Sequence, residues 1–292
     1  MTNKTQSDST IEAVDAATRK GIDFLHEHQL PNGEFACYYS PDAAMQEYCV
    51  PDSAVFPVCL IVSCLLPFKE ITNAKAICAA AVKFLTYQMM RGGVWNYFTR
   101  WHKFFKFCPA DTDDTVYASH VLRSLNVDIP DNREVLLSNR NSKGLFYTWF
   151  VTRNISDVFG KSKMVHLREF KYPLNSLLFW FSNEARRNDT NEARRNDIDP
   201  VVNANILYYL GYNDDTKAIV EFLLQVLYKE QESEGDKWYG NPISFYYFLS
   251  RNYTKVRQLE PAREIVVQRI YDNYNIDGSI GSSVLSTAMG LT

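Results

Sequence analysis

The sequence predicts an all-α protein whose helical pairs close into a single (α/α)6 barrel over residues 11–292. The 292 residues include only 12 Gly and 11 Pro, and few stretches alternate apolar and polar residues as a half-buried strand does. Apolar residues recur instead at helical spacing. One order of elements also repeats along the chain: an amphipathic helix, a turn and a more apolar helix.

Six turns that contain glycine or asparagine mark this repeat. They are centred at positions 33, 93, 144, 196, 240 and 278, so that successive turns lie 38 to 60 residues apart. A repeat of about this length accommodates a pair of helices. Six pairs, each with an outer amphipathic and an inner apolar helix, fit a closed barrel in which the N-termini of the inner helices meet at one end.

Individual elements follow from periodicity, start signals and turn residues. Residues 1–10 are polar and are predicted to form a disordered tail. Helices are predicted over residues 11–29, 54–66, 74–90, 111–125, 173–181, 201–210, 242–253 and 284–291. A charged eight-residue segment, 183–190, is nearly duplicated at 191–198 and is expected to be a solvated connection.

Composition excludes several classes of protein. A net charge of −3 argues against a nucleic-acid groove, which needs a basic surface. The six cysteines form no Cys-x-x-Cys pair, which favours free thiols in a reducing compartment and hence the cytoplasm. The longest apolar run, residues 54–68, is too short to span a bilayer. Aromatic residues make up 14% of the chain, and their ring faces suit either a core or a pocket for a cation.

Three carboxylates are crowded at the start of the predicted helix 111–125. Asp111, Asp113 and Asp114 follow Pro109 and precede an apolar run. In one interpretation they only cap the helix, because acidic side chains satisfy the free N–H groups at a helix N-terminus. In the other they are chemical, because neighbouring carboxyl groups cannot all ionise at neutral pH and one can remain a proton donor.

The segment Asp111-Thr112-Asp113-Asp114-Thr115 resembles the Asp-x-Asp-Asp-Thr motif of class II, protonation-initiated terpene cyclases of the squalene–hopene cyclase type. The turns after Gln29 and Gln88 resemble degenerate Gln–Trp repeats of the same superfamily. The chain resembles the small single-domain bacterial type, which is similar to the cyclase domain of drimane-forming sesquiterpene synthases. This resemblance implies a barrel like the terpene cyclase β-domain. It also implies cyclisation of an acyclic isoprenoid, a prenyl diphosphate such as farnesyl diphosphate.

The resemblance makes Asp113 the general acid, and Asp111 and Asp114 are expected to hold its proton by hydrogen bonding or charge. Aromatic residues at turn ends and inner-helix starts are candidates for the pocket wall, although each is also a plausible core residue: Trp95, Trp149, Tyr246 and Tyr247. Asn203 and Asn205, on an otherwise apolar helix, either contact the acid or join two helices. Lys103 and Arg251 are candidates to bind a diphosphate.

Neither a resident metal nor another cofactor is expected, apart from a magnesium ion bound with the substrate diphosphate. Class II relatives enclose their cavity between two barrels, so a homodimer or a second subunit is a candidate to close the pocket. Two other functions remain open: a non-catalytic barrel that binds an isoprenoid or a partner, and a barrel like the protein prenyltransferases, which use zinc. The sequence offers no spacing of Cys and His typical of zinc ligands.

Overall fold

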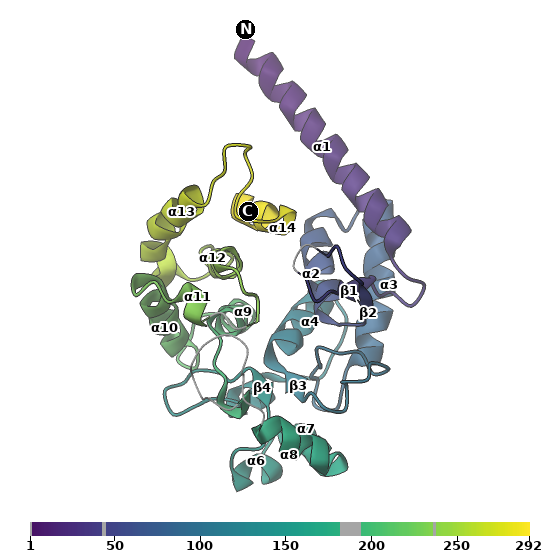
Figure 1. Ribbon diagram of the computed structural model, residues 1–292, viewed down its shortest axis with the longest axis vertical. Helices are drawn as coiled ribbons and strands as arrows, with labels where there is room; N and C mark the ends of the chain where they lie inside the picture. Colours follow the sequence, from purple (N-terminus) through teal and green to yellow (C-terminus); the bar gives the residue numbers. More distant parts are fainter. Residues whose placement is uncertain (1, 43–44, 182–193, 236–237) are drawn as a thin grey trace. The chain divides into compact units, whose positions relative to one another are not determined.

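The computed structural model describes residues 2–42, 45–181, 194–235 and 238–292. These residues are mostly helical, with four short strands (Figure 1). The chain divides into two compact units. Unit 1 comprises Met1–Met89, Asn96–Phe105 and Ala118–Ile129, and unit 2 comprises Met90–Trp95, Lys106–Tyr117 and Pro130–Thr292. No helix within the described ranges has the length and apolar character needed to cross a bilayer.

Unit 1 is formed by the N-terminal helices and one hairpin. Its elements are α1 (Thr2–His28), β1 (Cys37–Tyr39), β2 (Val50–Asp52), α2 (Phe56–Leu65), the 3₁₀ turn η1 (Leu66–Phe68) and α3 (Thr72–Gln88). Strands β1 and β2 pair antiparallel, with Tyr38 opposite Pro51. Helix α3 contacts both α1 and α2. The buried side chains of this unit, which include Val58, Val62, Ile77 and Leu85, recur at helical spacing on α2 and α3.

Unit 2 carries the acidic motif and most of the remaining helices. Its shorter elements are β3 (Ala110–Asp111), α5 (Arg133–Ser138), β4 (Trp149–Phe150), α6 (Ile155–Phe159), η2 (Arg194–Asn196), α11 (Glu232–Gly235) and η3 (Arg257–Ala262). Its longer helices are α7 (Lys163–Lys171), α8 (Pro173–Phe181), α9 (Pro200–Leu210), α10 (Lys217–Tyr228), α12 (Pro242–Ser250), α13 (Arg263–Asp272) and α14 (Val284–Leu291). Helix α9 packs against α10 and α12, and α12 also packs against α14 (Figure 1). Helix α4 (Thr112–Ser124) begins in unit 2 and ends in unit 1.

Four of the six predicted turns share one local structure. In each, two residues form an isolated antiparallel bridge around a glycine with positive φ; the bridges are Gln29–Phe35, Met90–Val94, Arg140–Phe146 and Tyr274–Ile280. Gly33 shows why glycine is required, because a Cβ atom there would lie 2.3 Å from the carbonyl oxygen of Ala80. The side chain of Gln29 donates to the carbonyl of Gly33 at 3.0 Å and to that of Ile77 at 3.2 Å, so it ties its turn to α3.

The inner helices of unit 2 begin with a polar cap, as the sequence pattern predicts. Asp199 caps α9 by accepting hydrogen bonds from the N–H groups of Val201 and Val202, and Asn241 caps α12 through the N–H group of Ile243. Both helices carry proline at their first position, where no N–H group is lost. These caps satisfy donors that burial would otherwise leave unpaired.

The all-α prediction is confirmed, and the predicted helices match α1, α2, α3, α4, α8, α9, α12 and α14 closely. One difference lies at the N-terminus, where α1 extends back to Thr2 instead of leaving a disordered tail at residues 1–10. That segment contains no Gly or Pro to end a helix. Most of the duplicated segment 183–198 lies outside the described residues, and one domain over residues 11–292 stays a prediction.

Candidate active site

Backbone hydrogen bonds to two neighbouring segments hold the first residue of the acidic motif, Asp111. Asp111 in β3 pairs with Trp149 in β4, and its N–H group donates to the carbonyl oxygen of Trp95 at 2.8 Å. The N–H group of Thr112 donates to the carbonyl oxygen of Thr148, also at 2.8 Å. Backbone hydrogen bonds of this kind set the direction in which α4 leaves the strand. Trp95 and Trp149, predicted as pocket residues, thus hold the motif through their backbones.

Asp111 is the N-cap of α4. Its Oδ1 accepts hydrogen bonds from the N–H groups of Asp113 at 2.7 Å and Asp114 at 3.1 Å. The hydroxyl of Thr115 adds a bond to the Asp111 carbonyl oxygen at 2.6 Å. The capping interpretation therefore describes Asp111, whose carboxylate is occupied by the helix backbone.

Asp113 is held by side chains from two distant segments of unit 2. It is 5% exposed, and its Oδ1 accepts a hydrogen bond from Nδ2 of Asn205 in α9 at 2.8 Å. Its Oδ2 accepts a hydrogen bond from the hydroxyl of Tyr239, which precedes α12. The Oδ1 of Asn205 in turn lies 3.4 Å from Nη1 of Arg251. The carboxyl group of Asp113 is therefore enclosed by two donors with a guanidinium behind them.

These neighbours act on the pKa of Asp113 in opposite directions. Burial disfavours the charged form and raises the pKa to about 6, while the donors Tyr239 and Asn205 and the charge of Arg251 counteract that rise. Burial thus keeps a proton available near neutral pH, and the donors stabilise the carboxylate that forms when the proton leaves. This combination is what a general acid requires.

The other two carboxyl groups also have raised pKa values. Burial is the main cause for both Asp111 and Asp114, and the negative charge of neighbouring carboxylates adds to it. Oδ1 of Asp114 is buried and has no hydrogen-bond partner among the described residues. A protonated Asp114 avoids the cost of an unpaired buried charge. The three carboxyl groups differ because their surroundings differ.

Aromatic rings adjoin the acid. The ring of Tyr239 lies 5.2 Å from that of Phe248, whose centroid is 6.2 Å from Tyr117 and 5.0 Å from Tyr247. The guanidinium of Arg251 is held against this group, 4.8 Å from the Tyr117 centroid and 2.5 Å from the Tyr117 hydroxyl. It also lies 4.2 Å from the centroid of Tyr208. Ring faces of this kind attract positive charge.

The structure brings only some of the predicted site residues together. Asn205, Tyr247 and Arg251 belong to the network around Asp113, and Arg251 is packed among rings instead of presenting a free cation to a diphosphate. Asn203 is instead a connection between backbone segments, with Oδ1 accepting from the N–H group of Phe146 and Nδ2 donating to its carbonyl oxygen, each at 3.0 Å.

Three other candidates have local roles of their own. The hydroxyl of Tyr246 lies 3.3 Å from Oε1 of Glu232. Lys103, in unit 1, is exposed and lies 5.0 Å from the centroid of the Phe104 ring. The indole of Trp149 packs edge-on against Phe179 and Trp238, with centroid distances of 5.3 and 5.2 Å.

Sequence reasoning missed Tyr239, Tyr117 and Phe248. Tyr117 had a usable signal, because it lies four residues after Asp113 and therefore on the same face of α4. Tyr239 had none beyond its place in a glycine-containing turn, since its contact with Asp113 joins residues 126 positions apart.

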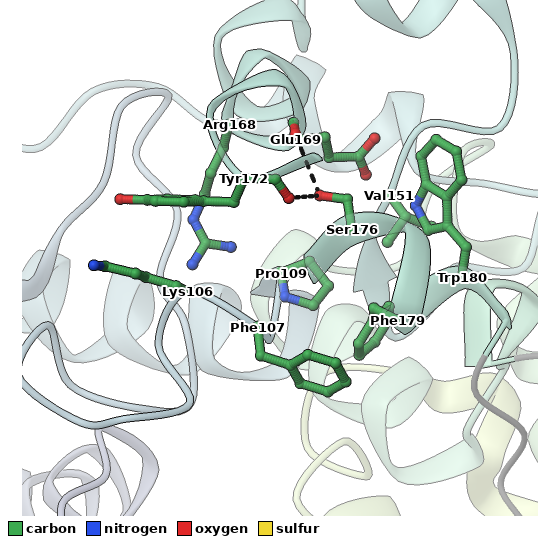
Figure 2. A pocket seen from close by; sticks show the side chains of 10 residues that line it. All are labelled: Lys106, Phe107, Pro109, Val151, Arg168, Glu169, Tyr172, Ser176, Phe179 and Trp180. Atoms are coloured by element: carbon green, nitrogen blue, oxygen red, sulfur yellow. Dashed lines mark hydrogen bonds between the residues drawn. The ribbon is translucent and has the colours of Figure 1, made fainter. Parts of the chain in front are cut away.

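Two hollows in unit 2 accompany the site, and Asp113 lines neither of them. The smaller, about 10 Å³, has Lys106, Arg168 and Tyr172 on one side and Trp180 on the other (Figure 2). A water molecule occupies about 30 Å³ of liquid, so this hollow is too small for a substrate. The larger, about 250 Å³, is lined mainly by polar side chains. Within the described part of the chain, no three His, Cys, Asp or Glu side chains are arranged to hold a metal ion.

The fold is similar to that of a solved type II terpene cyclase. A crystal structure of a protein from Actinoplanes matches with a TM-score of 0.63 at 19% identity, covering 95% of this chain and 73% of that one. Type II terpene cyclase MstE from Scytonema, in complex with its substrate geranylgeranyl dihydroxybenzoate, matches with a TM-score of 0.62 at 13% identity, covering 92% and 69%. Apo MstE gives 0.59 at 14% identity, covering 92% and 68%. No family model and no curated protein matches the sequence.

Proposed function

We propose that this protein is a class II terpene cyclase in which Asp113 protonates the terminal alkene of an acyclic isoprenoid. The observation that carries the proposal is the enclosure of Asp113, a buried carboxyl group with a pKa raised to about 6 and a donor on each oxygen. Neither neighbouring carboxyl group has this arrangement. The likeness in fold to a type II terpene cyclase supports the same class of reaction.

The proposed reaction begins as the O–H bond of Asp113 breaks and a C–H bond forms at the less substituted carbon of the terminal alkene. The alkene electrons form that bond and leave a tertiary carbocation, which a second alkene attacks to close a ring. Loss of a different proton ends the sequence, so that substrate and product have the same composition. Asn205 and Tyr239 stabilise the carboxylate left on Asp113, and solvent returns its proton.

The substrate that we propose is a prenyl diphosphate of about the length of farnesyl diphosphate. The substrate printed for MstE instead joins a geranylgeranyl chain to dihydroxybenzoate, so the head group has to be tested and not assumed. The described residues provide no ligand cluster for magnesium. A magnesium ion would therefore arrive bound to a diphosphate, and no step depends on it.

The decisive experiment is incubation in D₂O with farnesyl diphosphate, geranylgeranyl diphosphate and geranylgeranyl dihydroxybenzoate, followed by mass spectrometry. Protonation-initiated cyclisation gives a cyclic product one mass unit heavier than the product formed in water, with its head group retained. The Asp113→Asn variant is expected to form none, because an amide is not an acid at neutral pH. Gln225→Glu, an exposed change on α10, is the control and should match the wild type.

One observation weighs against catalysis by Asp113 and leaves binding without turnover as the second candidate: Asp113 lines neither of the two hollows described above. In that alternative the barrel binds an isoprenoid without transforming it. Saturable binding of a prenyl compound, with no product from either the wild type or Asp113→Asn, would support the alternative and contradict catalysis.

A further inference from the structure

The larger hollow of unit 2 is a polar cavity of about 250 Å³. It lies among the turn around Gly144, the segment after β4 and the buried face of α7, and its lining includes Asn139, Arg140, Arg153 and His166. At about 30 Å³ per molecule this volume equals roughly eight waters. It is therefore large enough for a small polar ligand.

None of the hydrogen bonds that the Arg153 guanidinium makes to described residues goes to a carboxylate. Its guanidinium donates to the carbonyl oxygens of Trp149 and Val151, each at 3.1 Å, and to Oδ1 of Asn139 at 2.9 Å. It also stacks on Tyr147, 3.6 Å from the ring centroid. These partners are all neutral, and the buried Nε has no hydrogen-bond partner among the described residues. Burial lowers the pKa of Arg153 to about 10, although the charges of Asp157 and Glu169 act in the opposite direction.

His166 adds a second unsatisfied group to the same cavity. Its side chain is only 3% exposed, and Nδ1 makes no hydrogen bond to any described residue. Buried polar atoms are normally paired with protein, water or a ligand. Arg140 contributes further positive charge, part of which is neutralised by Asp215 at 3.3 Å.

The carboxylate of Asp157, the acidic residue of the lining, is bonded to backbone N–H groups. Its Oδ2 accepts hydrogen bonds from the N–H groups of Arg153 at 2.8 Å and Asn154 at 2.9 Å, as part of the capping box of α6. The remaining polar neighbours, which include Asn139, Asn141 and Ser142, are uncharged. The described lining therefore contains two guanidinium groups and one carboxylate.

We propose that this cavity is a binding site for a small oxyanion of the phosphate class, held by the guanidinium of Arg153 and the imidazole of His166. An oxyanion supplies an anion bonded directly to the guanidinium and a partner for the unpaired nitrogen atoms. The site stands independently of the proposed cyclisation. Free phosphate and the diphosphate of a prenyl compound share the chemistry that it recognises.

Asn139 connects this site to the acidic motif. It accepts the hydrogen bond from Arg153 and donates to the hydroxyl oxygen of Thr112, the first residue of α4, at 3.0 Å. Thr112 immediately precedes Asp113. An anion that binds the guanidinium of Arg153 therefore affects the hydrogen bonding of Asn139, and the Asn139 side chain positions the start of α4.

The test is calorimetric titration of the full chain with inorganic phosphate and with diphosphate, using chloride at equal ionic strength as the reference. The informative variant is Asn154→Asp. Asn154 is exposed at the cavity edge and caps α6, and Asp caps a helix as well as Asn does, so this variant is expected to fold. Its added negative charge should weaken phosphate binding roughly tenfold. Gln225→Glu adds the same charge outside the lining and should bind as the wild type does.

Saturable binding that Asn154→Asp weakens and Gln225→Glu preserves would support the site. No saturable binding to the wild type at millimolar phosphate, or equal binding by both variants, would overturn it. Farnesyl diphosphate that displaces phosphate would assign the site to a substrate head group, and failure to displace would assign it to free phosphate. The Arg153→Lys variant keeps the charge but loses the planar fork, so it should bind phosphate more weakly than the wild type.

Discussion

Asp111, Asp113 and Asp114 are adjacent in sequence, yet each has a different set of neighbours. Asp111 is bonded to backbone N–H groups, Asp113 to two side-chain donors, and one oxygen of Asp114 has no partner among the described residues. All three are aspartates, so residue type alone does not show which of them is the candidate acid. The assignment of the acid therefore depends on Asn205 and Tyr239 as much as on Asp113 itself.

The pH dependence of turnover should follow the protonation of Asp113. Only the protonated form can donate, and its pKa is raised to about 6. Activity should therefore be highest below this value and fall as pH rises through it, approaching a tenfold loss per pH unit. Initial rates from pH 5 to pH 8 measure the midpoint. A rate that increases through this interval would contradict a role for Asp113 as the acid.

Tyr239→Phe should move that midpoint to higher pH. The Tyr239 hydroxyl donates to Asp113 and thereby lowers the pKa of the acid, so its removal raises the pKa and leaves a weaker acid. The maximal rate should fall while the profile shifts. Tyr246→Phe is the matched control, because that hydroxyl faces Glu232. If both variants keep the wild-type midpoint, Tyr239 does not position the acid.

At this scale the sequence indicated Asp113 as the candidate acid and Asn205 as a candidate contact, but not Tyr239, the other side chain that bonds to Asp113. Asn203 and Asn205 were equally good candidates, because both interrupt an apolar helix. Two residues correspond to about 200° around a helix, so the two side chains leave α9 on nearly opposite faces. Only packing decides that Asn205 meets Asp113 while Asn203 meets the backbone of Phe146.

At the level of elements, Asp111 and Asp199 cap α4 and α9 in the same way. Each aspartate receives two backbone N–H groups on one oxygen. Polar caps and turn glycines were visible in the sequence, which explains why the starts of α9, α12 and α14 were predicted within a residue or two. Short strands such as β3 and β4 were not visible, because two-residue pairings depend on contacts distant in sequence.

Asp111→Ala should lower the free energy of unfolding by about 2 kcal/mol, because it leaves buried N–H groups without an acceptor. Asp111→Asn keeps an acceptor oxygen and should cost less than about 1 kcal/mol. Urea denaturation followed by circular dichroism measures both. Asp199→Ala provides the comparison on α9, with a loss similar to that of Asp111→Ala. Equal losses for Asn and Ala at position 111 would show that charge, and not capping, is what matters there.

At the scale of the whole molecule, fold class was accessible from the sequence because repeats and helical periodicity extend over many residues. The division into two units was not, since the chain enters each unit more than once. A boundary of this kind leaves no linker composition to detect. Helix α4 is the element that contributes to both units.

Thiol labelling can test how the units unfold. None of the six cysteines, all of which are among the described residues, is in a disulfide, and Cys49 and Cys64 are exposed, so these two should react rapidly in the native protein. Burial raises the pKa of Cys37 to about 11, which should slow its reaction. Cys59 and Cys78 are buried in unit 1 and Cys108 in unit 2. Because α4 runs unbroken through both units, the three should become reactive at one urea concentration, as mass spectrometry can measure.

Earlier labelling of Cys108 than of Cys59 and Cys78 would instead mean that unit 2 opens by itself. Slow labelling of Cys49 or Cys64 in the native state would contradict their exposure.

The guanidinium held among the tyrosine rings near Asp113 has an implication for the course of any cyclisation. A permanent positive charge on that side favours departure of the proton, yet it repels the carbocation that the proton creates. Positive charge would therefore be driven along the isoprenoid away from Arg251, so ring closure would have a built-in direction. Arg251→Met, which removes the charge and keeps a long side chain, should accordingly release more of the products that lose their proton early, before the last ring forms.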